Sequence, residues 1–359
     1  MLNCRQVNFG FISMWFNFKH RWKNLNQCFG VFLFLSSISI CWGHHTQFSP
    51  QAQENMRDFI SSLSARYSFD RSYLEKIFTK VRLQQKPLSL IRPSKTDKSQ
   101  TITWDHYRKL FVNKDNIDKG KRFISTHIVS LEKAQKSYGV PPEVIAAIIG
   151  IETKYGKNQG KFPVFDTLAT LAFESSGREN FFREELEAFI LLCLDQGLQI
   201  NKIKGSYAGA IGIPQFMPSS WRTFAIDFDQ NGKTNLLISP KDAIGSVANY
   251  LHKHGWDRNI PTHSVAIQEP GSNAKQFFTY ELQAEYKYND LQKGGFKDPL
   301  NKIPAYLDVS LVDLRLRNDE IIYWLATKNF FAVTKYNRSY KYAAAVLELA
   351  EALKNKSGS

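Results

Sequence analysis

An almost uninterrupted apolar helix that ends in a single acid constrains the fold more than any other feature of the sequence. It lies within "PPEVIAAIIGIETKYGKNQG", residues 141–160. Proline is tolerated in the first turn of a helix, so the pattern predicts a helix from about Pro142 to Tyr155, followed by a break at Gly156. A helix this apolar has to be enclosed by other elements, which favours a mainly helical core.

Glu152 is the one acid near the end of this helix. Four apolar residues precede it by three, four, seven and eight positions and therefore share its face: Val144, Ile145, Ile148 and Ile149. Burial disfavours a carboxylate and raises its pKa, so Glu152 is a candidate general acid. The alternative is a glutamate that turns to solvent in the last helical turn or pairs with a buried arginine.

A second segment, "GSYAGAIGIPQFMPSSW" at residues 205–221, contains three glycines and two prolines. This composition predicts a constrained loop whose backbone can approach a ligand closely. Ser206, Tyr207 and Gln215 offer hydrogen-bonding groups, which suits a sugar. The alternative is a tight structural connection.

A third segment, "DFDQNGKTNLLISPKD" at residues 227–242, resembles the first half of a calcium-binding loop. Asp227, Asp229 and Asn231 alternate before a glycine, as calcium ligands do in such loops. The twelfth position should be an acid but is Ile238, and the next acid, Asp242, is expected to complete a capping box with Ser239. The alternative is a polar turn held by its own side chains.

The last distinctive segment, "TKYNRSYKYAAAV" at residues 334–346, gathers Tyr336, Asn337, Tyr340 and Tyr342 before an alanine-rich helix. Aromatic and amide groups together suit stacking on sugars and binding of hydroxyls. Packing at a domain junction is the alternative.

Apolar spacing predicts further helices over residues 56–81, 119–138, 164–174 and 179–201, another that begins at Ser239, and a last one from about Ser339 to Leu353. Residues 264–322 contain short β-rich stretches, "FFTYEL", "AYLDVSLVDL" and "IIYWLA". The chain is thus predicted to be mainly α, with a small β subdomain near residues 262–325.

The first 43 residues have the pattern of an export signal. They contain no acid, and Lys19, Arg21 and Lys23 precede an apolar run, Cys28–Gly43, that is too short to span a membrane. We expect cleavage after Gly43, since lipidation at Cys41 requires a small preceding residue and Ile40 is not small. The full chain has a net charge of +14, and cleavage would remove four Lys or Arg residues and no acid, so the exported protein stays basic. It is expected to meet an anionic extracytoplasmic partner and no nucleic acid.

Taken together, these motifs resemble the lytic murein transglycosylase B family. The matching blocks begin with "PPEVIAAIIGIETKYGKNQGKFPVFDTLATLAF" and "GSYAGAIGIPQFMPSSW" and end with "KNFFAVTKYNRSYKYAAAV", in family order over roughly residues 55–355. After the predicted signal peptide at 1–43, the resemblance implies a helical region at 44–138, a lysozyme-like catalytic core at 139–261, a β subdomain at 262–325, and a helical region at 326–359 that packs with the N-terminal helices.

The resemblance also implies the chemistry. Such enzymes cleave the β-1,4 bond between N-acetylmuramic acid and N-acetylglucosamine in peptidoglycan without water, leaving a 1,6-anhydromuramic acid end. By motif position Glu152 is the single catalytic acid and base, and five residues line the glycan cleft: Ser206, Gln215, Tyr336, Asn337 and Tyr342. Asp227, Asp229 and Asn231 match a loop that binds calcium in some members, although the segment between Asn235 and Asp242 is one residue longer here than in the family pattern.

The expected protein is therefore an exported monomer of the periplasm, associated with the outer membrane, that acts on peptidoglycan strands. It needs no cofactor, and calcium would serve only as a structural ion. Two rival functions stay open on the sequence: a hydrolytic muramidase on the same fold, and a peptidoglycan-binding protein without catalysis.

Overall fold

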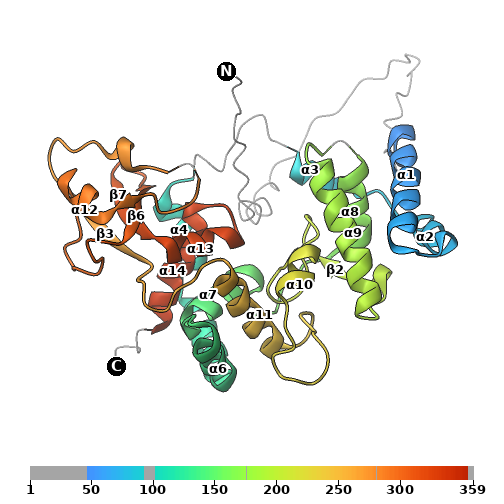
Figure 1. The fold of residues 1–359 in the computed structure, drawn as a ribbon, viewed down its shortest axis with the longest axis horizontal. Coiled ribbons are helices and arrows are strands. Elements are labelled where there is room, and N and C mark those ends of the chain that lie inside the picture. The colour runs from blue at the N-terminus through green and yellow to red at the C-terminus, as the bar shows by residue number, and fades with distance from the viewer. Residues whose placement is uncertain (1–46, 93–101, 175, 280, 355–359) are drawn as a thin grey trace, which may run out of the picture.

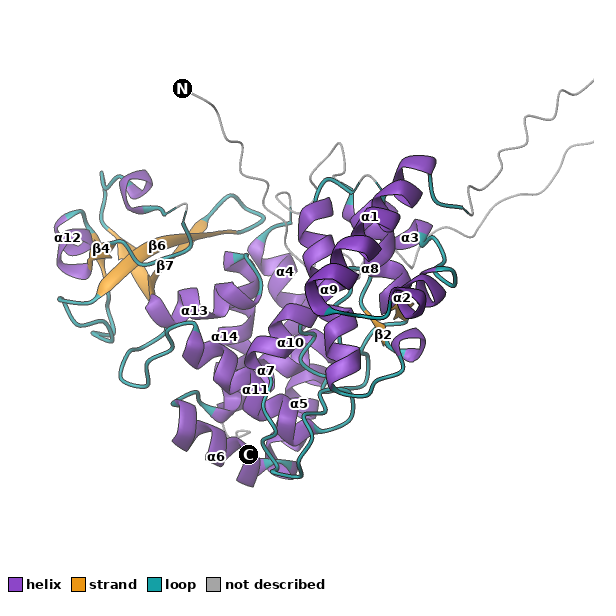
Figure 2. Cartoon of the chain, turned by 45° about the vertical axis from the view of Figure 1, so that its right-hand side comes forward, coloured by secondary structure: helices purple, strands orange, loops and turns teal. Residues whose placement is uncertain are grey.

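The structure is a computed structural model that describes residues 47–92, 102–174, 176–279 and 281–354. It is mainly helical with one small antiparallel sheet at one end (Figure 1; Figure 2). The predicted signal peptide, with Cys41 and the cleavage position, lies outside the described residues. Cys193 is a free, buried cysteine.

Helix α7 (Pro142–Thr153) is the centre of the fold, because most of its residues are apolar and ten of its twelve are buried. Such a helix needs neighbours on every side. Its main contacts are with α5 (Lys114–Thr126), α6 (Ile128–Tyr138), α11 (Pro240–Lys253) and α14 (Tyr340–Lys354).

A second group of helices occupies the right-hand side of Figure 1. Helix α8 (Val164–Phe173) packs against α9 (Glu179–Asp195), and α9 against α10 (Pro218–Phe224). Two N-terminal helices contact α8: α1 (Pro50–Tyr67), which also packs on α2 (Arg71–Phe78), and α3 (Gln85–Ile91).

Helices from the two halves of the chain meet on another side of α7. Helix α14 contacts α4 (Trp104–Phe111), α5 and α13 (Lys328–Tyr336). The Arg108 side chain of α4 forms an ion pair with Glu348 of α14, and Lys341 donates to the Ile102 carbonyl oxygen at 2.6 Å. These contacts fix α4 on the C-terminal helix.

The sheet has the strand order β4-β6-β7-β3-β5, with every neighbouring pair antiparallel. Its strands are β3 (His263–Gln268), β4 (Tyr286–Lys287), β5 (Phe296–Lys297), β6 (Asp308–Arg315) and β7 (Ile321–Thr327). One face packs on helix α12 (Tyr288–Lys293) around a small separate core that includes Phe296 and Leu325. A second, two-stranded sheet joins β1 (Phe162–Pro163) to β2 (Lys204–Gly205).

Some elements differ from the sequence prediction. The helix predicted over 56–81 is two helices, because Ser68 adopts a left-handed conformation and Asp70 then caps α2. The helix predicted over 119–138 divides at His127 into α5 and α6. Within "FFTYEL", Phe277 ends a short 3₁₀ helix and Phe278 forms only an isolated bridge with Leu311, so this stretch is no strand of the sheet.

None of the described helices combines the length and the apolar character that crossing a membrane requires.

Candidate active site

Glu152 lies in the last turn of α7, one residue before the helix ends. The helix stops because Lys154, Tyr155 and Gly156 all have positive φ angles, of 51°, 62° and 83°. Thr153 ties this end to the glycine-rich segment, since its hydroxyl donates to the Ile213 carbonyl oxygen at 2.8 Å and accepts from the Gly156 amide at 2.9 Å. The end of α7 that carries Glu152 is therefore held both by the glycine-rich segment at Ile213 and by the turn at Gly156.

The Glu152 carboxyl accepts a hydrogen bond from the Tyr342 hydroxyl, with 2.7 Å between the two oxygens. Burial raises the pKa of Glu152 from 4.5 to about 7, and the bond from Tyr342 opposes that rise. The side chain keeps some contact with solvent, whereas Tyr342 is fully buried. An acid with this pKa holds its proton over much of the neutral range and can give it to a bound leaving group.

Two more tyrosines lie near this carboxyl. The pKa of Tyr107 on α4 and that of Tyr336 on α13 are raised, first by burial and then by the negative charge of Glu152. The sequence interpretation included Tyr336 but missed Tyr107. Nothing in "WDHYRKLF" separates Tyr107 from an ordinary core aromatic, because its place beside Glu152 depends on how α4 packs on α14.

The glycine-rich segment forms a tight loop against the end of α7. Gly212 has φ +76°, and a Cβ atom there would lie 2.5 Å from the Leu236 carbonyl oxygen, so only glycine fits. Ser206 holds the turn, because its hydroxyl accepts from the amides of Ala208 and Ala210 at 3.2 and 3.0 Å.

Gln215 also belongs to this loop and has a positive φ of 52°. Its amide nitrogen donates to the carbonyl oxygens of Gln159 and Gly212, at 3.1 and 2.8 Å. Tyr336 reaches the same loop and donates to the Pro214 carbonyl oxygen. Asn337 follows Tyr336 directly and is buried. The structure thus brings Glu152, Tyr336 and Tyr342 together and sets the loop of Ser206 and Gln215 beside them.

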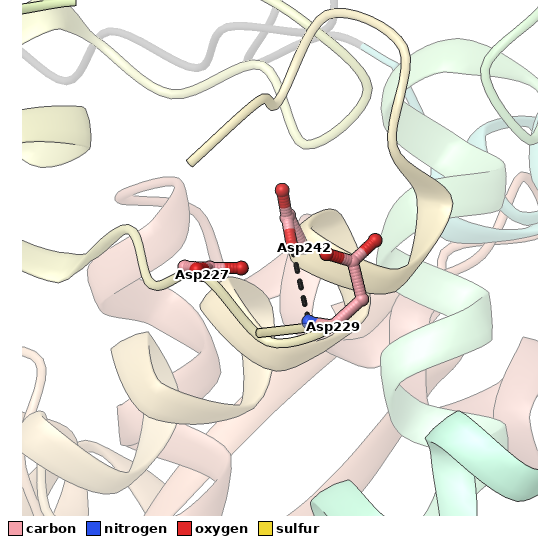
Figure 3. Close-up of side chains that lie close together, drawn as sticks. All are labelled: Asp227, Asp229 and Asp242. Carbon is pink, nitrogen blue, oxygen red and sulfur yellow. Dashed lines mark hydrogen bonds between the residues drawn. The ribbon is translucent and has the colours of Figure 1, made fainter. Parts of the chain in front are cut away.

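The acidic loop lies just before α11, whose first turn contains Asp242. Figure 3 shows the carboxylates of Asp227, Asp229 and Asp242 close together, with their oxygens within 4.8 Å of one another. Asp242 is buried, and its carboxylate accepts from the amides of Phe228 and Asn235 at 3.0 and 2.8 Å.

Two details of this loop differ from the sequence reading. Ser239 does cap α11, but the Asp242 carboxylate faces the loop instead of completing a capping box. The third acid of the cluster is therefore Asp242, fifteen positions after Asp227 in sequence number. The Asn231 side chain accepts from the Lys233 amide at 3.0 Å.

The cluster fits a hard cation such as calcium. Oδ1 of Asp229 is buried without a hydrogen-bond partner among the described residues, and three carboxylates at this separation repel one another. Oxygen ligands of this kind are those that calcium prefers. Asp227, Asp229 and Asp242 would hold the ion, which would fix the loop against α11.

We expect calcium to raise the melting temperature of the protein by roughly 5 °C at about one hundred times its dissociation constant. Thermal melts with calcium and with a chelator measure this change. Asp229→Asn should lose most of the shift, whereas Asp58→Asn, an exposed acid on α1, should keep it. A melting temperature of the wild type that does not respond to calcium would contradict the assignment.

Comparison with known proteins finds the same family that the sequence motifs resemble. The family model described as "Transglycosylase SLT domain" matches residues 51–351. The chain is 35% identical over 308 residues to the membrane-bound lytic murein transglycosylase B of Escherichia coli (strain K12), covering 83% of this chain and 82% of that protein.

Two solved structures are similar over most of the chain. The soluble lytic transglycosylase SltB1 from Pseudomonas aeruginosa has a TM-score of 0.77 and 37% identity, covering 83% of this chain and 98% of that one. The Escherichia coli lytic transglycosylase Slt35 in complex with calcium has a TM-score of 0.74 and 34% identity, covering 87% of this chain and 97% of that one. The matched family model, the matched relatives and the shared fold together show that the chain belongs to the lytic murein transglycosylase B family, whose members carry the transglycosylase SLT domain.

Proposed function

We propose that the protein is a peptidoglycan lytic transglycosylase that cleaves the β-1,4 bond between N-acetylmuramic acid and N-acetylglucosamine and leaves 1,6-anhydromuramic acid ends. The observation that carries this proposal is the Glu152 carboxyl, whose pKa is raised to about 7 and which Tyr342 holds at 2.7 Å. Membership of the family supplies the reaction class.

One carboxyl suffices for this reaction. Most glycosidases use two carboxyls that lie ~5–9.5 Å apart, one of which attacks the sugar or activates water. Burial raises the Glu152 pKa and the hydrogen bond from Tyr342 lowers it, and no second carboxyl of the described residues shifts this pKa. The substrate supplies what is missing, because its N-acetyl group stabilises the developing positive charge at the anomeric carbon.

Glu152 takes part in two proton transfers, first as an acid and then as a base. The protonated carboxyl first gives its proton to the glycosidic oxygen, and the bond from the anomeric carbon to that oxygen breaks. Tyr342 donates to the carboxylate that is left, which stabilises it. That carboxylate then removes the proton from the 6-hydroxyl of muramic acid, and the 6-oxygen closes the ring on the anomeric carbon. Glu152 is protonated again at the end of the cycle.

The residues around Glu152 are proposed to bind the glycan. Ser206 and Gln215 lie in the glycine-rich loop, Tyr336 and Tyr342 lie on α13 and α14, and Asn337 directly follows α13. The support is their place in the fold: Tyr342 contacts Glu152 itself, and Tyr336 contacts the loop at Pro214. Tyr107 also lies near Glu152, but it is buried and packs around the acid.

The cellular location is proposed from the predicted export signal and from the relative that the chain matches. An exported protein of the periplasm, associated with the outer membrane, agrees with the predicted signal at 1–43 and with a relative that is described as membrane-bound. The proposed partner is peptidoglycan, and the proposed state is a monomer. The proposed domain limits are those of the sequence: 44–138, 139–261, 262–325 and 326–359.

Product analysis on purified sacculi tests the function. We expect the wild-type protein to release muropeptides with anhydromuramic acid ends, because no water enters the reaction; mass spectrometry and borohydride reduction distinguish these ends from reducing ones. Reducing ends would identify a hydrolytic muramidase. Binding to sacculi without any release would identify a non-catalytic peptidoglycan-binding protein.

A further inference from the structure

Three consecutive residues after α7 adopt left-handed backbone conformations, and the middle one is a tyrosine. Lys154, Tyr155 and Gly156 have φ angles of 51°, 62° and 83°. Glycine adopts such a conformation freely, whereas a bulky side chain is strained in it. One left-handed residue is enough to end a helix, and glycine is the usual one. Tyr155 therefore strains the break to which it belongs, and backbone strain of this kind is concentrated at functional sites.

The Tyr155 side chain fills a slot between two helices. Its ring lies against Gly150 of α7, where an added Cβ atom would come within 2.5 Å of the ring, and its hydroxyl lies against Gly120 of α5, where an added Cβ atom would also collide with it. Both glycines are buried and neither has a positive φ, so the tyrosine, and not the backbone, requires them. The Phe123 ring lies beside the slot, with 5.5 Å between the two ring centroids.

The hydroxyl of Tyr155 connects the end of α7 to a second part of the site. It donates to the Asn116 carbonyl oxygen at 2.9 Å. The Asn116 side chain in turn donates at 2.8 Å to the carbonyl oxygen of Phe111, the last residue of α4. Helix α4 carries Tyr107, whose pKa is raised by burial and then by the negative charge of Glu152. These hydrogen bonds therefore link the helix that carries the acid to a helix that packs around it.

Glu152 lies three residues before Tyr155, in the turn that the break ends. Its carboxyl lies 2.7 Å from the Tyr342 hydroxyl. A displacement of about 1 Å can lower the rate of an enzyme about 10²-fold, so a catalytic group depends on residues that hold it without touching the substrate. Thr153 supports this turn from the glycine-rich segment, and Tyr155 supports it from α5.

From this geometry we infer that Tyr155 is a positioning residue for the reaction: its ring and hydroxyl fix the left-handed break after α7 and so hold the Glu152 carboxyl against Tyr342. Tyr155 acts through Glu152, since its own hydroxyl is engaged with Asn116. The inference rests on the proposed function, because it concerns the acid of the same reaction. It also explains why a tyrosine stands where glycine would end the helix without strain.

Tyr155→Phe tests the inference, because it keeps the ring in its slot and removes only the bond to Asn116. We expect kcat on soluble, uncross-linked glycan strands to fall about tenfold, because Glu152 then spends much of its time out of place, while KM stays within about twofold. Tyr288→Phe is the matched control in the β subdomain, since the Tyr288 hydroxyl accepts from the Asp298 amide at 2.6 Å. It should lower the melting temperature by a similar amount and leave kcat unchanged.

The pH dependence separates positioning from a general loss of stability. Burial is the larger cause of the raised pKa of Glu152, so a carboxyl that moves toward water should have a lower pKa. Tyr107, Tyr336 and Tyr342 respond to its charge, and their own raised pKa values keep them neutral between pH 5 and 8. The alkaline limb of the rate profile should therefore move to lower pH in Tyr155→Phe.

The same shift appears in stability without any turnover. Glu152 ionises more readily in the unfolded chain than in the folded one, so the wild type loses stability between pH 5 and pH 8. Tyr155→Phe should lose less melting temperature over this interval, because its folded-state pKa is closer to the unfolded one.

Three results would overturn the inference: a kcat of Tyr155→Phe within about twofold of the wild-type value, an alkaline limb that stays in place, or an equal loss of kcat in Tyr288→Phe. Failure of the proposed function would show differently, as wild-type protein that releases no anhydro ends from the strands. The melting temperatures would then decide, since an equal loss between pH 5 and pH 8 in wild type and Tyr155→Phe would also overturn the inference.

Discussion

Glu152→Gln is expected to lower the rate of anhydromuropeptide release by about 10³-fold, within the 10²–10⁴ range of general acid–base groups, while strands still bind. Glutamine has nearly the same shape and can accept the Tyr342 hydrogen bond, but it has no proton to give to the glycosidic oxygen and cannot take one from the 6-hydroxyl. Turnover of purified sacculi, followed by chromatography of the released products, measures the loss.

The same variant makes a prediction about stability. Because the pKa of Glu152 rises from 4.5 to about 7 on folding, the wild type loses stability as the pH increases between these values, by up to about 3 kcal/mol. Glutamine cannot ionise, so the variant should melt a few degrees higher than wild type at pH 8 and at nearly the same temperature at pH 5.

Glu143→Gln is the matched control for both measurements, because it removes a charge from the first turn of the same helix, far from the site. It should keep full activity. If Glu152→Gln retained more than a tenth of the wild-type rate, Glu152 would not be the acid.

Tyr342→Phe is expected to shift the pH profile of the enzyme as well as its rate. The Tyr342 hydroxyl lowers the pKa of Glu152, so its removal should raise that pKa. A hydrogen bond to a charged group contributes roughly 1.5–3 kcal/mol, which corresponds to about one to two pH units. Glu152 must be protonated to start the reaction, so the alkaline limb of the profile should move to higher pH by that amount.

The rate at the optimum should fall at least tenfold, because the carboxylate formed in the first step loses its donor. Initial rates on sacculi between pH 5 and 9 measure both effects. Tyr340→Phe is the control on the same helix, since its hydroxyl bonds the Thr279 carbonyl oxygen at 2.6 Å and has no contact with Glu152. A lower rate with an unmoved alkaline limb would mean that Tyr342 acts through packing alone.

Local sequence patterns predicted the secondary structure correctly where it depends on residues that are close together in the chain. The apolar run predicted α7 from Pro142, and the structure ends it at Thr153, two residues before the predicted end, because Lys154 and Tyr155 adopt left-handed conformations. The β-rich stretches around Leu311 and Leu325 became β6 and β7. The family motifs also selected Glu152, although only the place of that residue in the fold supplies its chemical environment.

In the acidic loop, positions counted along the sequence do not identify all the residues of the cluster. Counting along the loop leads to Ile238, which cannot bind a metal, whereas the folded chain places Asp242 from the first turn of α11 beside Asp227 and Asp229. Tyr107 is a similar case, since α4 reaches Glu152 only through its packing on α14.

The sequence by itself determined that the chain is mainly helical, that its central helix must be buried, and that one acid at the end of that helix is a candidate for catalysis, because spacing and apolar character are local properties. Only the tertiary structure decided that Tyr342, 190 positions away, donates to that acid, that burial raises its pKa to about 7, and that Asp242 joins Asp227 and Asp229 in one cluster. The physical reason is that desolvation and hydrogen bonding act through space, on atoms that distant segments bring together when the core forms.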